Sequence, residues 1–187
     1  RSGYTGDDGF EISIPSQAAE IVTTSLLEHE TVELAGLGAR DSLRLEAGLC
    51  LYGQDIDATT SPVAAGLKWA MHTSRLSGGY KEGKFPGAEK ILSEISDGTE
   101  YKLVGFVPLG KAPIRANTEL FVRSSSSDKI GWITSGSFSP TLKHPIALGY
   151  VKKEYSIQGN RVNAQVRGKL LEIEVTKLPF VKKNFKK

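Results

Sequence analysis

The sequence predicts an α+β fold, in which a region of mixed helices and strands precedes a mostly β region. Apolar residues at helical spacing dominate the first part, whereas short β-type runs separated by Gly, Pro and Ser follow from Lys102 onward. The charge changes too, since residues 1–83 carry 6 Lys and Arg against 12 Asp and Glu, and residues 84–187 carry 18 against 9. We therefore predict two units, 1–83 and 84–187, that meet at a Gly-rich, linker-like stretch.

The first unit begins with an alternating apolar pattern and continues with helical spacing. Pro15 ends the alternating run, and Ser16 is a suitable N-cap for the helix that follows it. The predicted elements are a strand over 9–15, helices over 16–29 and 37–50, and a short helix or turn over 62–71.

The second unit opens with a predicted helix over 88–95, which Asp97 and Gly98 end. Six short β-type runs follow, at 103–108, 119–122, 130–134, 146–151, 161–166 and 169–175. Arg167 and Gly168 form a predicted hairpin turn between the last two runs. Several short strands with regular turn signals indicate an antiparallel barrel or a sandwich.

The helix over 37–50 combines apolar residues with charges that a simple surface helix does not need. Its leucines lie on two sides, which predicts that the helix is largely buried. Arg40 and Arg44 are four residues apart and share a face, so each needs a carboxylate, a carbonyl or a ligand. Arg40 has a plainer alternative, in which it reaches solvent or pairs with Asp41 or Glu46.

Composition excludes several classes of function. With 39% hydrophobic and 24% charged residues, the chain has the composition of a soluble globular protein, and no apolar run approaches a membrane span. The basic second unit lacks the aromatic-interleaved motif of nucleic-acid binders, so we expect no nucleic-acid partner. An acidic protein or a polyanionic cofactor tail fits its charge equally well.

The cysteine and histidine content predicts neither a disulfide nor a metal site. Cys50 is the single cysteine, and we interpret it as a small buried apolar residue rather than a nucleophile. The three histidines are far apart and show no metal-ligand spacing. The paired acids Asp7 and Asp8 suggest acid–base work or a cation site, but a turn beside Gly6 explains them better.

Several motifs, in order along the whole chain, closely resemble the aminomethyltransferases of the glycine cleavage system, the T-protein family. They are residues 3–12, residues 36–53 with Ala39-Arg40-Asp41-Ser42, residues 61–69, Gly131-Trp132-Ile133-Thr134-Ser135-Gly136, Ser139-Pro140-Thr141-Leu142 and Pro179-Phe180-Val181. The resemblance implies that residues 1–83 end an α+β folate-binding region and that residues 84–187 form a C-terminal antiparallel β-barrel domain. It covers only about the C-terminal half of such a protein, which makes a truncated sequence the expected reading.

The resemblance also implies a set of folate-binding residues. The family's pterin-binding glutamate falls on Glu11, which would otherwise face water, and one carboxylate can accept hydrogen bonds from the pterin amino group and ring N–H together. Arg40 matches an arginine that contacts folate, and Tyr4 lines the pocket. Arg115 closes over the ligand from the barrel side or has a structural role. Phe185 stands where the family has a tyrosine, so ring stacking survives there and a phenolic hydrogen bond does not.

The reaction that the resemblance implies transfers a one-carbon unit from the aminomethyl-lipoyl arm of the H-protein to tetrahydrofolate, with release of ammonia. The family's catalytic aspartate lies in the N-terminal portion, so we expect no catalytic residue in this chain and no activity from it alone. The segments 49–52 and 179–181 look more like mitochondrial members, which favours the mitochondrial matrix over a bacterial cytoplasm. The alternatives are the folate-binding region of a dimethylglycine or sarcosine dehydrogenase, and a non-catalytic folate- or RNA-binding adaptor.

Overall fold

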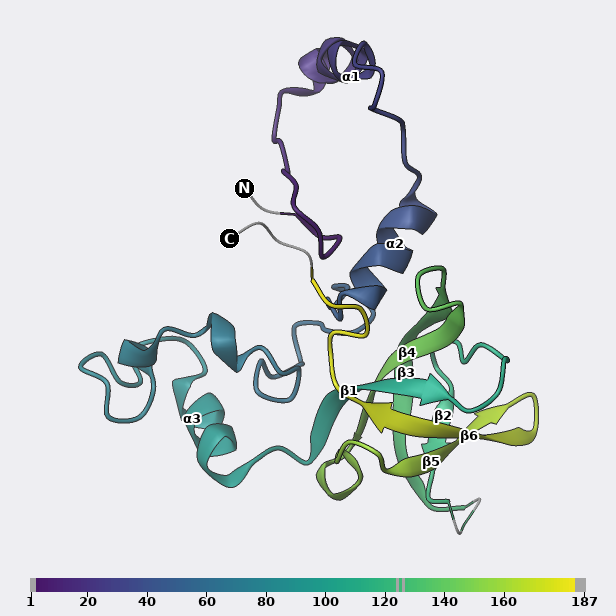
Figure 1. The fold of residues 1–187 in the computed structure, drawn as a ribbon. Coiled ribbons are helices and arrows are strands. Elements are labelled where there is room, and N and C mark those ends of the chain that lie inside the picture. The colour runs from purple at the N-terminus through teal and green to yellow at the C-terminus, as the bar shows by residue number, and fades with distance from the viewer. Residues whose placement is uncertain (1–2, 124, 126, 184–187) are drawn as a thin grey trace.

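The computed structural model describes residues 3–123, 125 and 127–183. Its centre is a closed antiparallel barrel with the strand order β1-β4-β3-β2-β5-β6 (Figure 1). The strands are β1 (Tyr101–Pro108), β2 (Glu119–Phe121), β3 (Lys129–Ser139), β4 (His144–Lys152), β5 (Arg161–Val166) and β6 (Lys169–Thr176). The prediction of an antiparallel barrel in the second unit is therefore confirmed.

Alternation along the strands fills the barrel interior with apolar side chains. Phe106, Leu120, Ile133, Val162 and Ile173 are fully buried there. Closure removes free sheet edges, so each strand is hydrogen-bonded to a neighbouring strand on both sides.

The hairpin between β5 and β6 turns at the predicted dipeptide. Arg167 and Gly168 both have a positive φ, 50° and 75°, as a two-residue turn of type I′ requires.

The helices are α1 (Ala19–Leu27), α2 (Leu37–Glu46) and α3 (Ala88–Asp97), with short 3₁₀ turns η1 (Ser16–Ala18), η2 (Lys68–Ala70), η3 (Thr73–Arg75) and η4 (Lys153–Tyr155). Each predicted helix is present, but α2 is shorter than the predicted range 37–50. It ends early because Gly48 has a φ of 67°, the left-handed conformation that commonly terminates a helix. Within the described residues, no helix is both long and apolar enough to cross a membrane.

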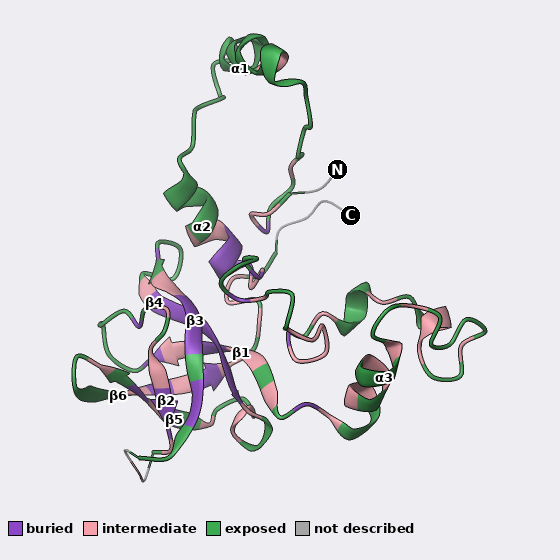
Figure 2. Cartoon of the chain, turned by 180° about the vertical axis from the view of Figure 1, so that it is seen from behind, coloured by how far each residue is buried: buried purple, intermediate pink, exposed green. Residues whose placement is uncertain are grey.

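Two predictions for the first unit are wrong. Residues 9–15 form no strand, because no described segment runs beside them to complete a ladder. Helix α2 is not largely buried: Arg44, Leu45 and Glu46 are buried, whereas Leu37 is 84% exposed. Only the last turn of α2 rests on the barrel, as the burial colours of Figure 2 show.

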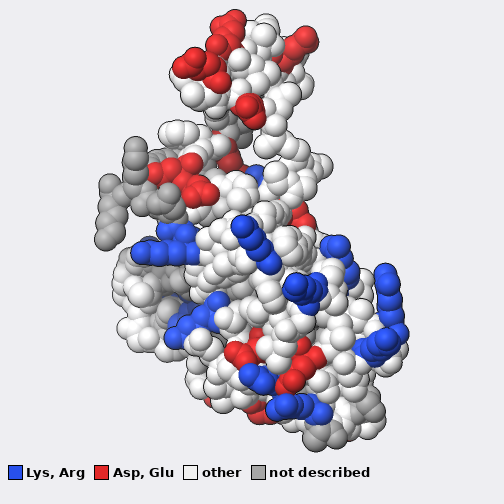
Figure 3. All heavy atoms as spheres, turned by 45° about the vertical axis from the view of Figure 1, so that its right-hand side comes forward, with Lys and Arg blue, Asp and Glu red and all other residues white. Residues whose placement is uncertain are grey.

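Residues 9–36, which include α1, form an arm that projects away from the barrel (Figure 1). Helix α1 has no buried residue, and each of its residues except Val22 is exposed (Figure 2). The charge asymmetry of the sequence appears on the surface, with acidic side chains on the arm and many Lys and Arg side chains on the barrel (Figure 3). The predicted boundary at 83/84 falls between η3 and α3, and it stays a prediction.

Candidate functional site

Three of the residues expected to bind folate lie together where the arm leaves and rejoins the barrel. The Nη2 atom of Arg40 lies 3.4 Å from Oε1 of Glu11, although 29 residues separate them in the sequence. The Arg40 guanidinium also lies over the ring of Tyr4, 5.4 Å from its centroid. Glu11 comes from the start of the arm, Tyr4 from the segment just before it, and Arg40 from α2, which follows the arm.

The ion pair between Glu11 and Arg40 is open to solvent. The two side chains are 52% and 51% exposed. Exposed pairs of this kind contribute about 1 kcal/mol or less, so little free energy opposes their separation. A ligand with its own donors or anionic groups can therefore take either partner.

Tyr4 is held more firmly than its two neighbours. Its phenol donates a hydrogen bond to the backbone carbonyl of Cys50. Burial raises the pKa of Tyr4, and the nearby Cys50 raises it further, so the phenol stays protonated at neutral pH. The ring thus forms a fixed wall of the cluster rather than a base.

A buried polar network lies directly beneath the cluster, at the last turn of α2. Arg44 is 2% exposed, and it donates hydrogen bonds to Asp41 at 2.8 Å, to the Leu49 carbonyl at 3.1 Å and to Ser135 at 2.9 Å. Its Nη1 atom also lies 2.5 Å from Oδ2 of Asp55, whose side chain is fully buried. Arg44 therefore meets carboxylates and a carbonyl, as its position on the helix predicted.

Asp55 completes this network from the loop that follows α2. Its carboxylate accepts hydrogen bonds from the Leu51 amide at 2.8 Å and from the Thr134 hydroxyl of β3. Its backbone carbonyl accepts one from the Tyr150 hydroxyl of β4 at 2.8 Å. The pair of Arg44 and Asp55 thus joins α2 to the barrel strands β3 and β4. Sequence reasoning missed Asp55, because an aspartate two residues after a glycine is typical of an ordinary loop.

Cys50 is buried next to this network. Burial raises the pKa of its thiol to about 11, with the Asp55 carboxylate adding to the effect. The thiol is therefore neutral at physiological pH, in agreement with the interpretation of Cys50 as a small buried residue.

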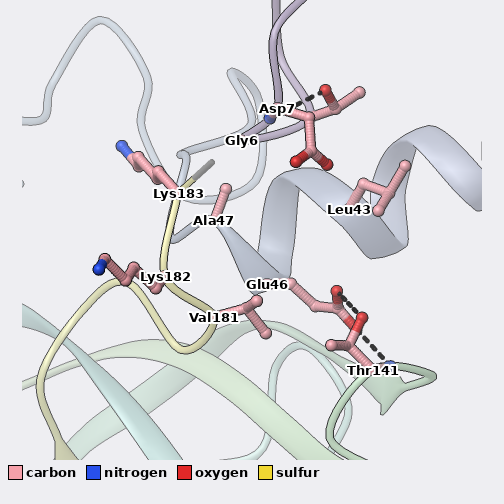
Figure 4. Close-up of a pocket in the computed structure, with 10 residues that line it drawn as sticks. Gly6, Asp7, Leu43, Glu46, Ala47, Thr141, Val181, Lys182 and Lys183 are labelled. Atoms are coloured by element: carbon pink, nitrogen blue, oxygen red, sulfur yellow. Dashed lines mark hydrogen bonds between the residues drawn. The ribbon is translucent and has the colours of Figure 1, made fainter. Parts of the chain in front are cut away.

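A cavity of about 240 Å³ lies where the N-terminal turn, α2 and the C-terminal segment meet (Figure 4). Its lining residues are Thr5, Gly6, Asp7, Leu43, Glu46, Ala47, Thr141, Val181, Lys182 and Lys183. A larger cavity of about 670 Å³ lies between the barrel and residues 47–69, and Tyr4 forms part of its wall. Its volume is in the range of small-molecule sites.

The remaining predicted site residues lie elsewhere. Arg115 follows β1, and its Nη1 atom donates to the Gly136 carbonyl at 3.3 Å, which ties the loop to β3. This hydrogen bond does not join Arg115 to Glu11 or Arg40. Phe185 lies outside the described residues. Asp7 belongs to a turn in which its amide donates to the Thr5 hydroxyl at 3.4 Å.

No three His, Cys, Asp or Glu side chains in the described part of the chain come together as a metal site.

Comparison with known proteins decides the family. Residues 1–75 match the GCVT N-terminal domain, and residues 102–182 match the glycine cleavage T-protein C-terminal barrel domain. The chain belongs to the glycine cleavage T-protein family. Both family matches agree with the α+β region and the barrel, which confirms the predicted fold class.

Relatives in the T-protein family are similar over nearly all of this chain. The mitochondrial aminomethyltransferases of Mesembryanthemum crystallinum and Solanum tuberosum are each 50% identical over 97% of the chain and 43% of their own length. The crystal structure of glycine cleavage system aminomethyltransferase T from Bartonella henselae is 42% identical, with a TM-score of 0.92 over 100% of this chain and 50% of that one. The chain thus spans less than half the length of these curated relatives.

Proposed function

We propose that this chain is part of a tetrahydrofolate-dependent aminomethyltransferase of the glycine cleavage system. The enzyme would transfer the one-carbon unit from the aminomethyl-lipoyl arm of the H-protein to tetrahydrofolate and release ammonia. The observation that carries the proposal is the cluster of Tyr4, Glu11 and Arg40, since residues far apart in sequence meet around one accessible carboxylate. Membership of the T-protein family supports it.

Each residue of the cluster has a proposed role that follows from its chemistry. The Glu11 carboxylate accepts hydrogen bonds from the adjacent amino group and ring N–H of the pterin, as it would from an arginine fork. Arg40 then supports the polar groups of the folate, and Tyr4 offers a ring face. Arg115 and Phe185 remain weaker members of the proposed site.

The acid–base step is assigned to no residue of this chain. By resemblance, the catalytic aspartate belongs to the N-terminal portion of the family, so the proposed part played by this chain is to bind and orient the acceptor. We therefore expect the 187 residues alone to release no ammonia from aminomethylated H-protein. Detectable ammonia or methylenetetrahydrofolate from them would contradict this expectation.

The proposed partner and compartment follow the relatives. The mitochondrial names of the plant, yeast and dog aminomethyltransferases support a mitochondrial matrix location, with a bacterial cytoplasm as the alternative. The basic barrel suits an acidic partner such as a lipoylated carrier protein, without any membrane or nucleic acid. The relatives' names favour an aminomethyltransferase over a dimethylglycine or sarcosine dehydrogenase or a binding adaptor.

The test is the tetrahydrofolate affinity of the full-length protein with Glu11→Gln. The change keeps the size of the side chain and removes the charge, and hydrogen bonds to charged groups contribute about 1.5–3 kcal/mol, so we expect Kd to rise roughly ten- to a hundredfold. Glu20→Gln on exposed α1 is the matched control and should leave Kd unchanged. Equal affinity of the wild type and Glu11→Gln would refute the proposed site.

A further inference from the structure

Glu46, the last residue of α2, joins three separate segments of the chain. It is 3% exposed. Its carboxylate accepts a hydrogen bond from the hydroxyl of Ser139, the last residue of β3. In the turn between β3 and β4 it accepts two more, from the Thr141 amide at 3.1 Å and from the Thr141 hydroxyl at 2.7 Å (Figure 4). Its backbone carbonyl accepts a hydrogen bond at 3.0 Å from the amide of Val181 in the C-terminal segment.

Helix stability alone does not explain this carboxylate. A negative charge at the C-terminal end of a helix opposes the helix dipole. Burial of a carboxylate also has a cost, and no Lys or Arg of the described residues forms an ion pair with Glu46. The three hydrogen bonds from Ser139 and Thr141 offset these costs only in one arrangement of α2 against the end of β3 and the turn after it. The buried charge of Glu46 therefore fixes how α2 sits against the barrel and does not stabilise the helix itself.

The elements of the proposed folate site converge on the residues next to Glu46. Gly6, in the turn after Tyr4, has a φ of 83°, and a Cβ there would lie 2.7 Å from Cβ of Ala47. Gly48 is similarly close to Leu178 at the start of the C-terminal segment, with 3.1 Å between its added Cβ and that side chain. The end of α2 is thus the point against which both terminal segments are seated.

Among the residues that the structure describes, none gives comparable support to the other end of α2, where residues 37–41 are exposed. Arg40 lies in this exposed half, so the anchors in the last turn set the direction in which it points. The pair of Arg44 and Asp55 fixes the helix against the barrel, and Glu46 adds the β3–β4 turn and the C-terminal segment.

We propose that Glu46 is a positioning residue for folate binding, which acts through Ser139 and Thr141 of the barrel. It holds Arg40 at a fixed place relative to Glu11 and Tyr4 while touching no substrate itself. This inference rests on the proposed function, because it assumes that the cluster of Tyr4, Glu11 and Arg40 receives tetrahydrofolate.

The experiment compares Thr141→Val with Thr141→Ser in the full-length enzyme. Valine removes the hydroxyl that bonds to Glu46 and keeps the shape of threonine, whereas serine keeps the hydroxyl. Because small displacements of positioning groups are costly, we expect Thr141→Val to raise KM for tetrahydrofolate about three- to tenfold while kcat changes less than twofold. Thr141→Ser keeps the hydroxyl, so its KM for tetrahydrofolate should equal that of the wild type.

A merely structural role gives a different pattern. Loss of folded enzyme would lower the apparent kcat and the melting temperature and would leave KM unchanged, which would overturn the proposal. Ser139→Ala removes another hydrogen bond to Glu46, so it serves if Thr141→Val does not fold, and the same rise in KM is expected.

Glu11→Gln, measured in parallel, separates this inference from the proposed function. If Glu11→Gln raises KM and neither barrel variant does, only the positioning role is wrong. If Glu11→Gln also leaves KM unchanged, the folate site itself is misplaced.

Discussion

Replacing Asp55 with asparagine should be among the most destabilising conservative changes in this chain. The side chains of Arg44 and Asp55 are 2% and 0% exposed and lie 2.5 Å apart. Asparagine keeps the shape and can still accept from the Leu51 amide, but it removes the charge that compensates Arg44. Breaking a buried ion pair by removing one partner costs about 3–5 kcal/mol.

The lower end of that range applies here, because Arg44 retains Asp41 as a second carboxylate. The Asp41 side chain is half exposed, so it compensates the guanidinium only in part. We therefore expect Asp55→Asn to lower the free energy of unfolding by about 3 kcal/mol. With a typical m-value of ~2 kcal/mol/M, the midpoint of urea unfolding would fall by roughly 1.5 M.

The assay is urea unfolding of the wild type and the variant at pH 7, followed by circular dichroism. Glu174→Gln is the control, because Glu174 pairs with Arg161 at 3.1 Å on the barrel surface, with both side chains well exposed. Glu174→Gln should lower the free energy of unfolding by less than about 1 kcal/mol. If Asp55→Asn behaves like this control, the buried pair does not hold α2 to the barrel, and the reasoning is refuted.

Three further outcomes are expected. Cys50 should resist iodoacetamide at pH 8 until urea unfolds the chain, as mass spectrometry would show. The pKa of its thiol, about 11 in the folded state, exceeds the ordinary 9.0, so the neutral thiol favours the folded state. This contribution to stability is complete below pH 9 and declines from pH 9 through 11. Gly136→Ala should cost about 3 kcal/mol in thermal unfolding, because the new Cβ would lie 1.8 Å from the backbone oxygen of Ile114. Arg167→Asn should raise the melting temperature slightly, because asparagine tolerates the φ of 50° better; a lower value would contradict the turn assignment.

Local patterns were sufficient to predict the barrel strands. All six runs overlap observed strands, and the range 161–166 coincides with β5. Alternation and turn residues act within a few residues of one another, so a single sequence contains them. The strand β3 is longer than predicted, since the run 130–134 continues through Gly136 to Ser139 across an irregularity between Ile133 and Ser135. Such an irregularity interrupts the period of two on which the prediction depended.

Features that depend on distant neighbours were not predictable. Residues 9–15 alternate as a strand should, but a strand also needs a partner, and alternation does not supply one. The apolar pattern of α2 indicated burial, whereas the barrel reaches only its last turn. Asp55 gave no signal because its partners, Arg44 and Thr134, lie 11 and 79 residues away.

The pairing of Arg40 follows from what its neighbours do. The sequence offered Asp41 and Glu46 as local partners, but Arg44 takes Asp41, and the turn between β3 and β4 takes Glu46. Arg40 is left with Glu11, across the base of the arm.

Because Arg40 pairs with Glu11 and not with a carboxylate of α2, the proposed site could accept its ligand at little cost in free energy. A pterin bound to Glu11 replaces one fork of N–H donors, the Arg40 guanidinium, with another, so the carboxylate keeps its hydrogen bonds. The carboxylates nearest to Arg40 on its own helix, Asp41 and Glu46, are already engaged by Arg44 and by Thr141. The charge of Arg40 then becomes available to the anionic groups of the folate. An arginine paired with a carboxylate of its own helix would stay paired when the pterin binds, and its charge would not become available.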